Sequence, residues 1–127
     1  MPLITKIFFL LGGFSALLAV MLGAFGAHVL KRSLTPELMA TYETAVDYHF
    51  YHTLGLLVVA LLTLHFPSSI LLKWSGWLMI LGILMFSGSL YALSVSGSHW
   101  LGGITPFGGM AFIIGWLMLI LAVLKAA

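Results

Sequence analysis

Histidine, tyrosine and acidic residues are the side chains of this sequence best able to do chemistry. An imidazole exchanges a proton near neutral pH and can bind a metal ion, and the five histidines all lie near the ends of apolar segments. The candidate polar site comprises His28, Glu43, Asp47, Tyr48, His49, Tyr51, His52, Tyr91, His99 and Thr105.

The spacing of these residues does not favour a metal site on one helix. His49 and His52 are three positions apart and could face one ion, whereas Glu43 and Asp47 would lie roughly 120–160° around the helix from His49. Zinc generally takes four ligands, and bis-histidine haem needs histidines on facing helices. The chain also has no cysteine. We therefore expect no metal and no cofactor.

Hydrogen bonding is the simpler assignment for the buried imidazoles. Tyr48 and His52 are four positions apart, as are Asp47 and Tyr51, so each pair would be neighbours on a helix. A neutral imidazole donates from one nitrogen and accepts at the other. We expect such a network to join the second apolar segment to the first and the third.

The composition places these residues in a membrane protein. The chain has 127 residues, of which 62% are hydrophobic and only 6% charged, and its mean hydropathy is +1.20. Soluble domains carry about 25% charged residues. Too few charges are present to cover a water-exposed surface, so we expect membrane lipid to be a partner. The net charge of +2 is too small to indicate nucleic-acid binding.

Four apolar segments are long enough to cross a bilayer, which takes about 20 residues. The predicted spans are residues 7–30, 48–66, 74–96 and 104–124. We therefore predict an all-α, polytopic membrane protein in which residues 1–127 form one domain, an antiparallel bundle of four transmembrane helices. Thr35-Pro36-Glu37 is typical of a helix start. It predicts a short interfacial helical segment before the second span, or a helix running straight into that span.

This topology groups the polar residues and the two termini at opposite ends of the bundle. The links after the first and third spans lie on one side, so we expect the candidate polar site there, and His65 at the other end. The termini share the side of Lys6, Lys73 and Lys125, against Lys31 and Arg32 on the other. Three cations against two favour cytoplasmic termini.

Small residues recur at every fourth position in two of the spans. Such stripes allow membrane helices to pack closely, so we expect both to be helix–helix contacts. The helix-packing residues are Ser15, Ala19, Gly23 and Ala27 in the first span and Gly88, Ala92 and Ser96 in the third. The glycine-rich run 102–109 lacks the lysine and spacing of a phosphate-binding loop, and predicts a tight turn.

Four short motifs resemble those of a known family. They are Gly23-Ala24-Phe25-Gly26-Ala27-His28, Tyr48-His49-Phe50-Tyr51-His52, Phe86-Ser87-Gly88-Ser89-Leu90-Tyr91 and Ile104-Thr105-Pro106-Phe107-Gly108-Gly109, the last followed by Gly115-Trp116. Together they resemble the DUF423 or UPF0382 family of small bacterial membrane proteins, to which eukaryotic transmembrane protein 256 is related. The resemblance implies a multi-pass protein of the bacterial inner (plasma) membrane and implies no activity.

Three functions remain open. The abundance of packing residues favours a non-enzymatic component that packs against another membrane protein, itself or lipid. The clustered histidines instead favour binding or translocation of a proton, a metal ion or a small polar ligand. A membrane enzyme is the least favoured, because the sequence contains no recognisable arrangement of nucleophile and base, and we predict no catalytic residues.

Overall fold

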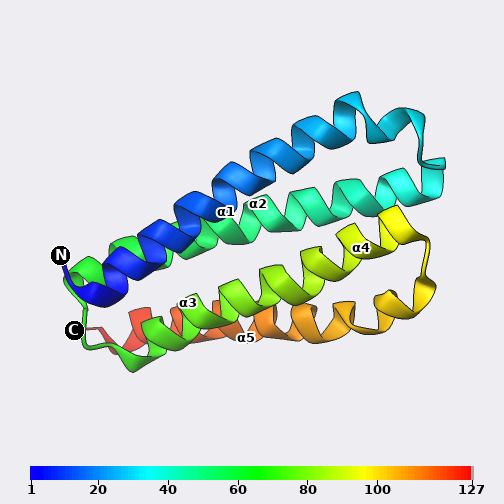
Figure 1. Ribbon diagram of the computed structural model, residues 1–127. Helices are drawn as coiled ribbons and strands as arrows, with labels where there is room; N and C mark the ends of the chain where they lie inside the picture. The colour runs from blue at the N-terminus through cyan, green and yellow to red at the C-terminus, as the bar shows by residue number, and fades with distance from the viewer. Residues whose placement is uncertain (127) are drawn as a thin grey trace.

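The computed structural model describes residues 1–126 as a bundle of helices (Figure 1). The helices are α1 (Leu3–His28), α2 (Pro36–His65), α3 (Ile70–Gly82), α4 (Gly88–Ser96) and α5 (Thr105–Lys125), with short 3-10 turns at Leu30–Arg32 and His99–Gly103. A π-helical turn, Ile83–Ser87, joins α3 to α4, so residues 70–96 cross the bundle as one rod. Four helical segments are long and apolar enough to span a membrane, which confirms the predicted fold class.

The bundle consists of two helical hairpins lying side by side. Helix α1 packs mainly on α2, and α5 packs mainly on α3, while α2 contacts α3 and α4 and so joins the hairpins. Figure 1 shows α1 diverging from the other helices toward the α1–α2 link, and both termini at the opposite end of the bundle. The chain ends therefore share one side, as the even number of spans predicts.

The second helix begins at the predicted Pro36 and includes the predicted second span, with no separate interfacial segment between positions 36 and 65. The Thr35 hydroxyl accepts a hydrogen bond from the Leu38 N–H at 3.2 Å, and Pro36 occupies the first turn. These capping features start a helix that continues to His65 without a break. Polar residues between positions 36 and 47 do not interrupt helical hydrogen bonding, so these residues belong to the same helix as the predicted second span. The alternative, a helix running straight into the span, is confirmed.

The third span also begins earlier than predicted. The Ser69 hydroxyl accepts from the Leu72 N–H at 3.3 Å, and this cap starts α3 at Ile70 rather than at Trp74. Pro67 lies in the short link before it, where the missing amide costs no helical bond.

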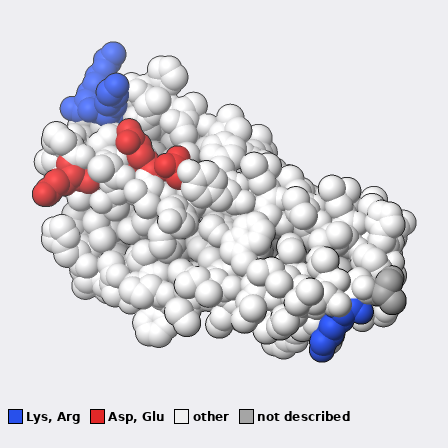
Figure 2. Space-filling view, turned by 180° about the vertical axis from the view of Figure 1, so that it is seen from behind, with Lys and Arg blue, Asp and Glu red and all other residues white. Residues whose placement is uncertain are grey.

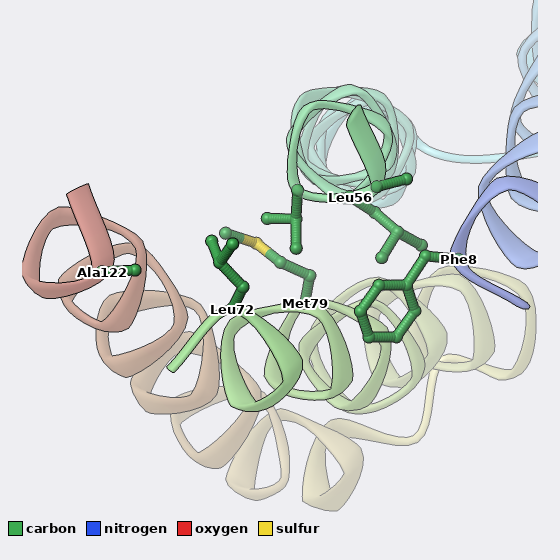
Figure 3. Packing of buried hydrophobic residues seen from close by; sticks show 7 residues of the cluster. Phe8, Leu56, Leu72, Met79 and Ala122 are labelled. Atoms are coloured by element: carbon green, nitrogen blue, oxygen red, sulfur yellow. The ribbon is translucent and has the colours of Figure 1, made fainter. Parts of the chain in front are cut away.

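The core is apolar and lies toward the end of the bundle that carries the termini. Figure 3 shows Phe8, Leu56, Leu72 and Met79 converging from three helices, with Ala122 contributed by α5. Large side chains fit against glycines: the Phe8 ring lies where a Cβ on Gly76 would be. Lipid tails are as apolar as these side chains, so the hydrophobic effect does not drive membrane helices together. Close packing of this kind therefore holds the two hairpins together.

The two predicted small-residue stripes differ in their surroundings. On α1, Ala19 is fully buried against α2, and a Cβ at Gly23 would lie 3.5 Å from Val46 of α2. The α1 stripe is therefore a contact within this chain, except that Ala27 at its end is exposed. On α4, Gly88 is only partly buried, and Ala92 and Ser96 are exposed. The α4 stripe contacts no other helix of the bundle closely.

Candidate functional site

The histidines of α2 lie near the middle of the bundle and not at its end. Helix α2 begins at Pro36, so His49 is about 20 Å along it at 1.5 Å per residue. The partner residue on α1, Ser15, is likewise near the middle of its helix. His49 and His52 were expected at the end of the bundle beside the α1–α2 link, but the helix that carries them starts a dozen residues earlier, which places them near its middle. The candidate polar site is thereby split into a central part and an end part.

His49 is the centre of a buried hydrogen-bond network that joins three helices. Its Nε2 lies 2.9 Å from the Ser15 hydroxyl on α1, and its Nδ1 lies 2.9 Å from the Tyr91 hydroxyl on α4. The Ser15 hydroxyl also lies 2.5 Å from that of Thr53, one turn further along α2. His49 is 4% exposed and Thr53 is fully buried. The expected link from the second span to the first and third is confirmed.

The network can hold its protons in two complementary arrangements. With the proton on Nε2, His49 donates to Ser15, Ser15 donates to Thr53, and Tyr91 donates to Nδ1. With the proton on Nδ1, each of these three bonds reverses its direction. Each arrangement satisfies both imidazole nitrogens, so the four groups form a continuous polar chain that we call the His49 chain: Thr53, Ser15, His49 and Tyr91.

Tyr42 extends this cluster toward the α1–α2 link. Its ring packs edge-on against that of Tyr91, with centroids 5.3 Å apart, and its hydroxyl donates to the Leu22 carbonyl of α1 at 2.5 Å. Gly26 permits this approach, because a Cβ at that position would overlap the Tyr42 ring. The glycine in the first short motif therefore has a packing role.

His52 lies in an aromatic environment on another side of α2. Its Nδ1 lies 2.8 Å from the Tyr48 backbone carbonyl, and a carbonyl only accepts, so Nδ1 donates. The imidazole stacks on Phe112 of α5 with ring centroids 3.4 Å apart and planes inclined by 9°. The Tyr48 ring lies on the same side, 4.5 Å from the ring of Phe86. His52 thus holds α5 against α2 through stacked rings.

The remaining histidines lie apart from the His49 chain. His28 is exposed at the end of α1, where its Nδ1 lies 2.8 Å from the carbonyl of Ala24. His99 is exposed in the 3-10 turn before α5. Thr105 bonds the Ser89 hydroxyl at 2.6 Å and joins α5 to α4. These three residues do not belong to the His49 chain, although they were predicted to share one site with it.

The two acids of the candidate site lie on the surface of α2. Glu43 and Asp47 are exposed and line a hollow of about 110 Å³ between α1 and α2, which Gly23 and Ala27 border from the α1 side. A space of this size can hold water, and water would lower the cost of carrying a carboxylate below the membrane surface. Tyr51, also predicted for the site, is 57% exposed and its ring neighbours only that of Tyr48.

The polar cluster around His49 also includes four residues that were not predicted for the site: Ser15, Thr53, Tyr42 and Ser87. Ser15 was predicted only as a packing residue, and Thr53 was not singled out, although its spacing of four from His49 places both on one face of α2. The Ser87 hydroxyl donates to the Ala45 carbonyl at 2.8 Å and joins the π turn to α2. Ser87 is part of the third short motif, but the motif gave it no partner, because the direction of its side chain depends on the π turn.

The described residues do not form a recognisable metal centre. Among positions 1–126, no three His, Cys, Asp or Glu side chains gather closely enough to hold an ion. In the same part of the chain, every buried side-chain nitrogen or oxygen has a hydrogen-bond partner. The polar groups of the interior are therefore engaged with one another.

Comparison with known proteins identifies similar sequences. The profile of the family described as "Protein of unknown function (DUF423)" matches residues 22–109. The UPF0382 membrane protein YwdK of Bacillus subtilis (strain 168) is 50% identical over 120 residues, which cover 94% of this chain and 98% of the relative. A UPF0382 membrane protein of Staphylococcus epidermidis (strain ATCC 12228) is 49% identical over 122 residues, or 96% and 98% of the two chains. No solved structure matches the chain.

Proposed function

This chain belongs to the DUF423 family of UPF0382 membrane proteins, and we propose that it is a non-enzymatic component of the bacterial inner membrane that packs against another transmembrane protein. The observation that carries the proposal is the uncovered stripe of α4, formed by Gly88, Ala92 and Ser96. Small residues four apart let a second helix approach the backbone closely, and this contact is a main source of helix association in lipid. The equivalent stripe of α1 already packs on α2.

The state of the buried polar groups supports a role without catalysis. Both nitrogens of His49 are engaged by hydroxyl groups, and Nδ1 of His52 is engaged by a backbone carbonyl. A general acid or base must instead reach a substrate atom directly or through one water. The hollow between α1 and α2 has neither His49 nor His52 in its lining.

Enlarging the α4 stripe tests this proposal. We expect Ala92→Leu to abolish most cross-linking from a photoreactive residue placed at Val95, which is 63% exposed on the same helix, because the added side chain holds a partner helix away from the α4 backbone. The measurement is the yield of cross-linked species after illumination of intact membranes, and their mass distinguishes a second copy from another protein.

The matched control is Ala24→Leu, an equal enlargement at an exposed position of α1. It should leave the cross-linking yield unchanged, and circular dichroism should show that both variants remain helical. A monomer that forms no cross-linked species, or an equal loss in both variants, would contradict the proposal.

We further propose that the termini face the cytoplasm. Lys6, Lys73 and Lys125 lie at the end of the bundle that carries the termini, whereas Lys31 and Arg32 lie at the other end. Cationic residues next to membrane spans accumulate on the cytoplasmic side. A reporter that is active only in the cytoplasm, fused to the C-terminal end of the chain, tests the orientation.

A proton-relay function is the second candidate, and the two arrangements of the His49 chain favour it. A hydrogen-bonded chain that can reverse direction can pass a proton without any cavity. We expect liposomes containing the protein to acidify faster than empty liposomes after a pH jump, as read by an enclosed pH-sensitive dye. His49→Leu should remove that increment because it interrupts the chain. Equal rates for the wild type and this variant would exclude the relay.

A further inference from the structure

A second hollow lies at the end of the bundle that carries the termini. It has a volume of about 520 Å³ and lies between the link from α2 to α3 and the last turns of α5. Leu62, Leu71, Ala122 and Val123 supply an apolar part, and Ser68 and Lys125 supply a polar part. An amphipathic hollow of this kind suits a ligand that is itself part apolar and part polar.

Positive charge dominates this end of the molecule. Three lysines lie in the terminal turns of helices at this end: Lys6, Lys73 and Lys125. The acidic side chains all lie toward the opposite end, in the first half of α2: Glu37, Glu43 and Asp47. On the face in Figure 2, acidic and basic side chains gather together at one end, and only basic ones show at the other. A ligand bound beside Lys125 therefore meets cations without competing carboxylates from those three acids.

Helix α3 adds to the positive potential of the hollow. Its first residues, Ile70 and Leu71, line the hollow together with the capping residue Ser69, and its first turn carries no acid. The N–H groups of a first helical turn lack partners within the helix, and the helix dipole places partial positive charge there. This is a secondary contribution beside that of the lysine.

The depth of the hollow matches the boundary between lipid headgroups and acyl chains. All four spans begin or end here, and Trp74 and Trp77, in the first turns of α3, are 57% and 44% exposed. Exposed tryptophans and lysines concentrate at this level of a bilayer. The apolar part of the hollow extends from that boundary along Leu62 and Val123, which lie within their spans.

We propose that this hollow binds an anionic phospholipid, with the phosphate beside Lys125 and the start of α3 and an acyl chain along the apolar lining. Basic recesses between transmembrane helices are suited to anionic headgroups. The binding site is separate from the α4 stripe, so either proposal can fail while the other stands.

Native mass spectrometry of the purified full-length protein tests the site. The protein is equilibrated with equal amounts of phosphatidylglycerol and phosphatidylcholine of the same acyl chains, and the bound lipids are counted. We expect preferential retention of phosphatidylglycerol. Lys125→Gln should weaken that retention about fivefold, the value of one cation near an anionic lipid. Val123→Trp, at a position 54% exposed, should lower retention by filling the apolar part.

Lys31→Gln is the matched control, because it removes an exposed cation from the opposite end. It should leave lipid retention unchanged. Equal binding of the two lipids overturns the proposal, as does equal weakening by Lys31→Gln and Lys125→Gln. A loss of both lipids in Val123→Trp without any preference in the wild type identifies an unspecific acyl-chain contact, and also overturns it.

Discussion

Gly108→Ala is expected to destabilise the bundle by about 3 kcal/mol or more, the upper range for overpacking. A Cβ at Gly108 would overlap the backbone nitrogen and Cα of Phe86 in the π turn. Backbone atoms inside a transmembrane rod cannot rotate away as a side chain can, so α5 would have to move off the third span. Unfolding in increasing dodecyl sulfate, followed by tryptophan fluorescence, measures the change.

The neighbouring glycine provides a closely matched control. A Cβ at Gly109 would lie 3.8 Å from the nearest atom of the Phe86 ring, an ordinary contact. Gly109→Ala should therefore unfold within about 1 kcal/mol of the wild type, the size of a helix-propensity change. Equal stability of the two alanine variants would show that α5 does not approach the π turn as closely as the structure places it.

This approach matters because the π turn positions the aromatic side of the buried cluster. The extra residue per turn directs Ser87 toward the Ala45 carbonyl of α2, and Phe86 lies between Tyr48 and Phe112. π turns inside membrane-length helices often occur at functional sites. In this chain the turn brings α2 and α5 into contact through side chains.

The sequence predicted the four spans because hydropathy and length alone determine them. It also predicted a helix start at Pro36, and α2 does begin there and runs straight into the second span. A helix can extend beyond the hydrocarbon, and α2 has 30 residues where about 20 suffice to cross. His49 and His52 were assigned to the end of the bundle because they lie at the start of the predicted span 48–66, whereas the helix that carries them begins 12 residues before that span.

The partners of each histidine depend on helix rotation, which spacing within one segment cannot determine. His49 and His52 are three apart and by spacing alone could face one ion, yet His49 faces α1 and α4 while His52 faces α5. The sequence also could not show which glycines lie against a side chain of another helix. Gly82 accommodates the Phe112 ring, whereas a Cβ at Gly88, just after the π turn, would meet no side chain within 4 Å.

His49→Leu is expected to lower the stability of the bundle by about 2 kcal/mol, because it removes two hydrogen bonds between helices and leaves the Tyr91 hydroxyl without its partner. Ser15 keeps its bond to Thr53, so the loss should not be larger. The same dodecyl sulfate titration measures it. His65→Leu, at an exposed position at the other end of α2, should have little effect.

A double-mutant cycle isolates the bond between α2 and α4. Tyr91→Phe should destabilise the wild type but add little to His49→Leu, giving a coupling of about 1 kcal/mol. Strictly additive losses would show that the two side chains do not interact.

His49→Gln separates the two roles considered for this residue. An amide can still donate to one hydroxyl and accept from another, but it cannot pass a proton by exchanging one nitrogen's hydrogen for the other's. If His49 serves only to join helices, His49→Gln should retain most of the stability that His49→Leu loses, and proton entry into liposomes should not change. If the His49 chain is a relay, the same variant should be stable and should lose the proton flux. Stability and proton flux measured on the His49→Gln variant therefore decide between a packing component and a proton pathway.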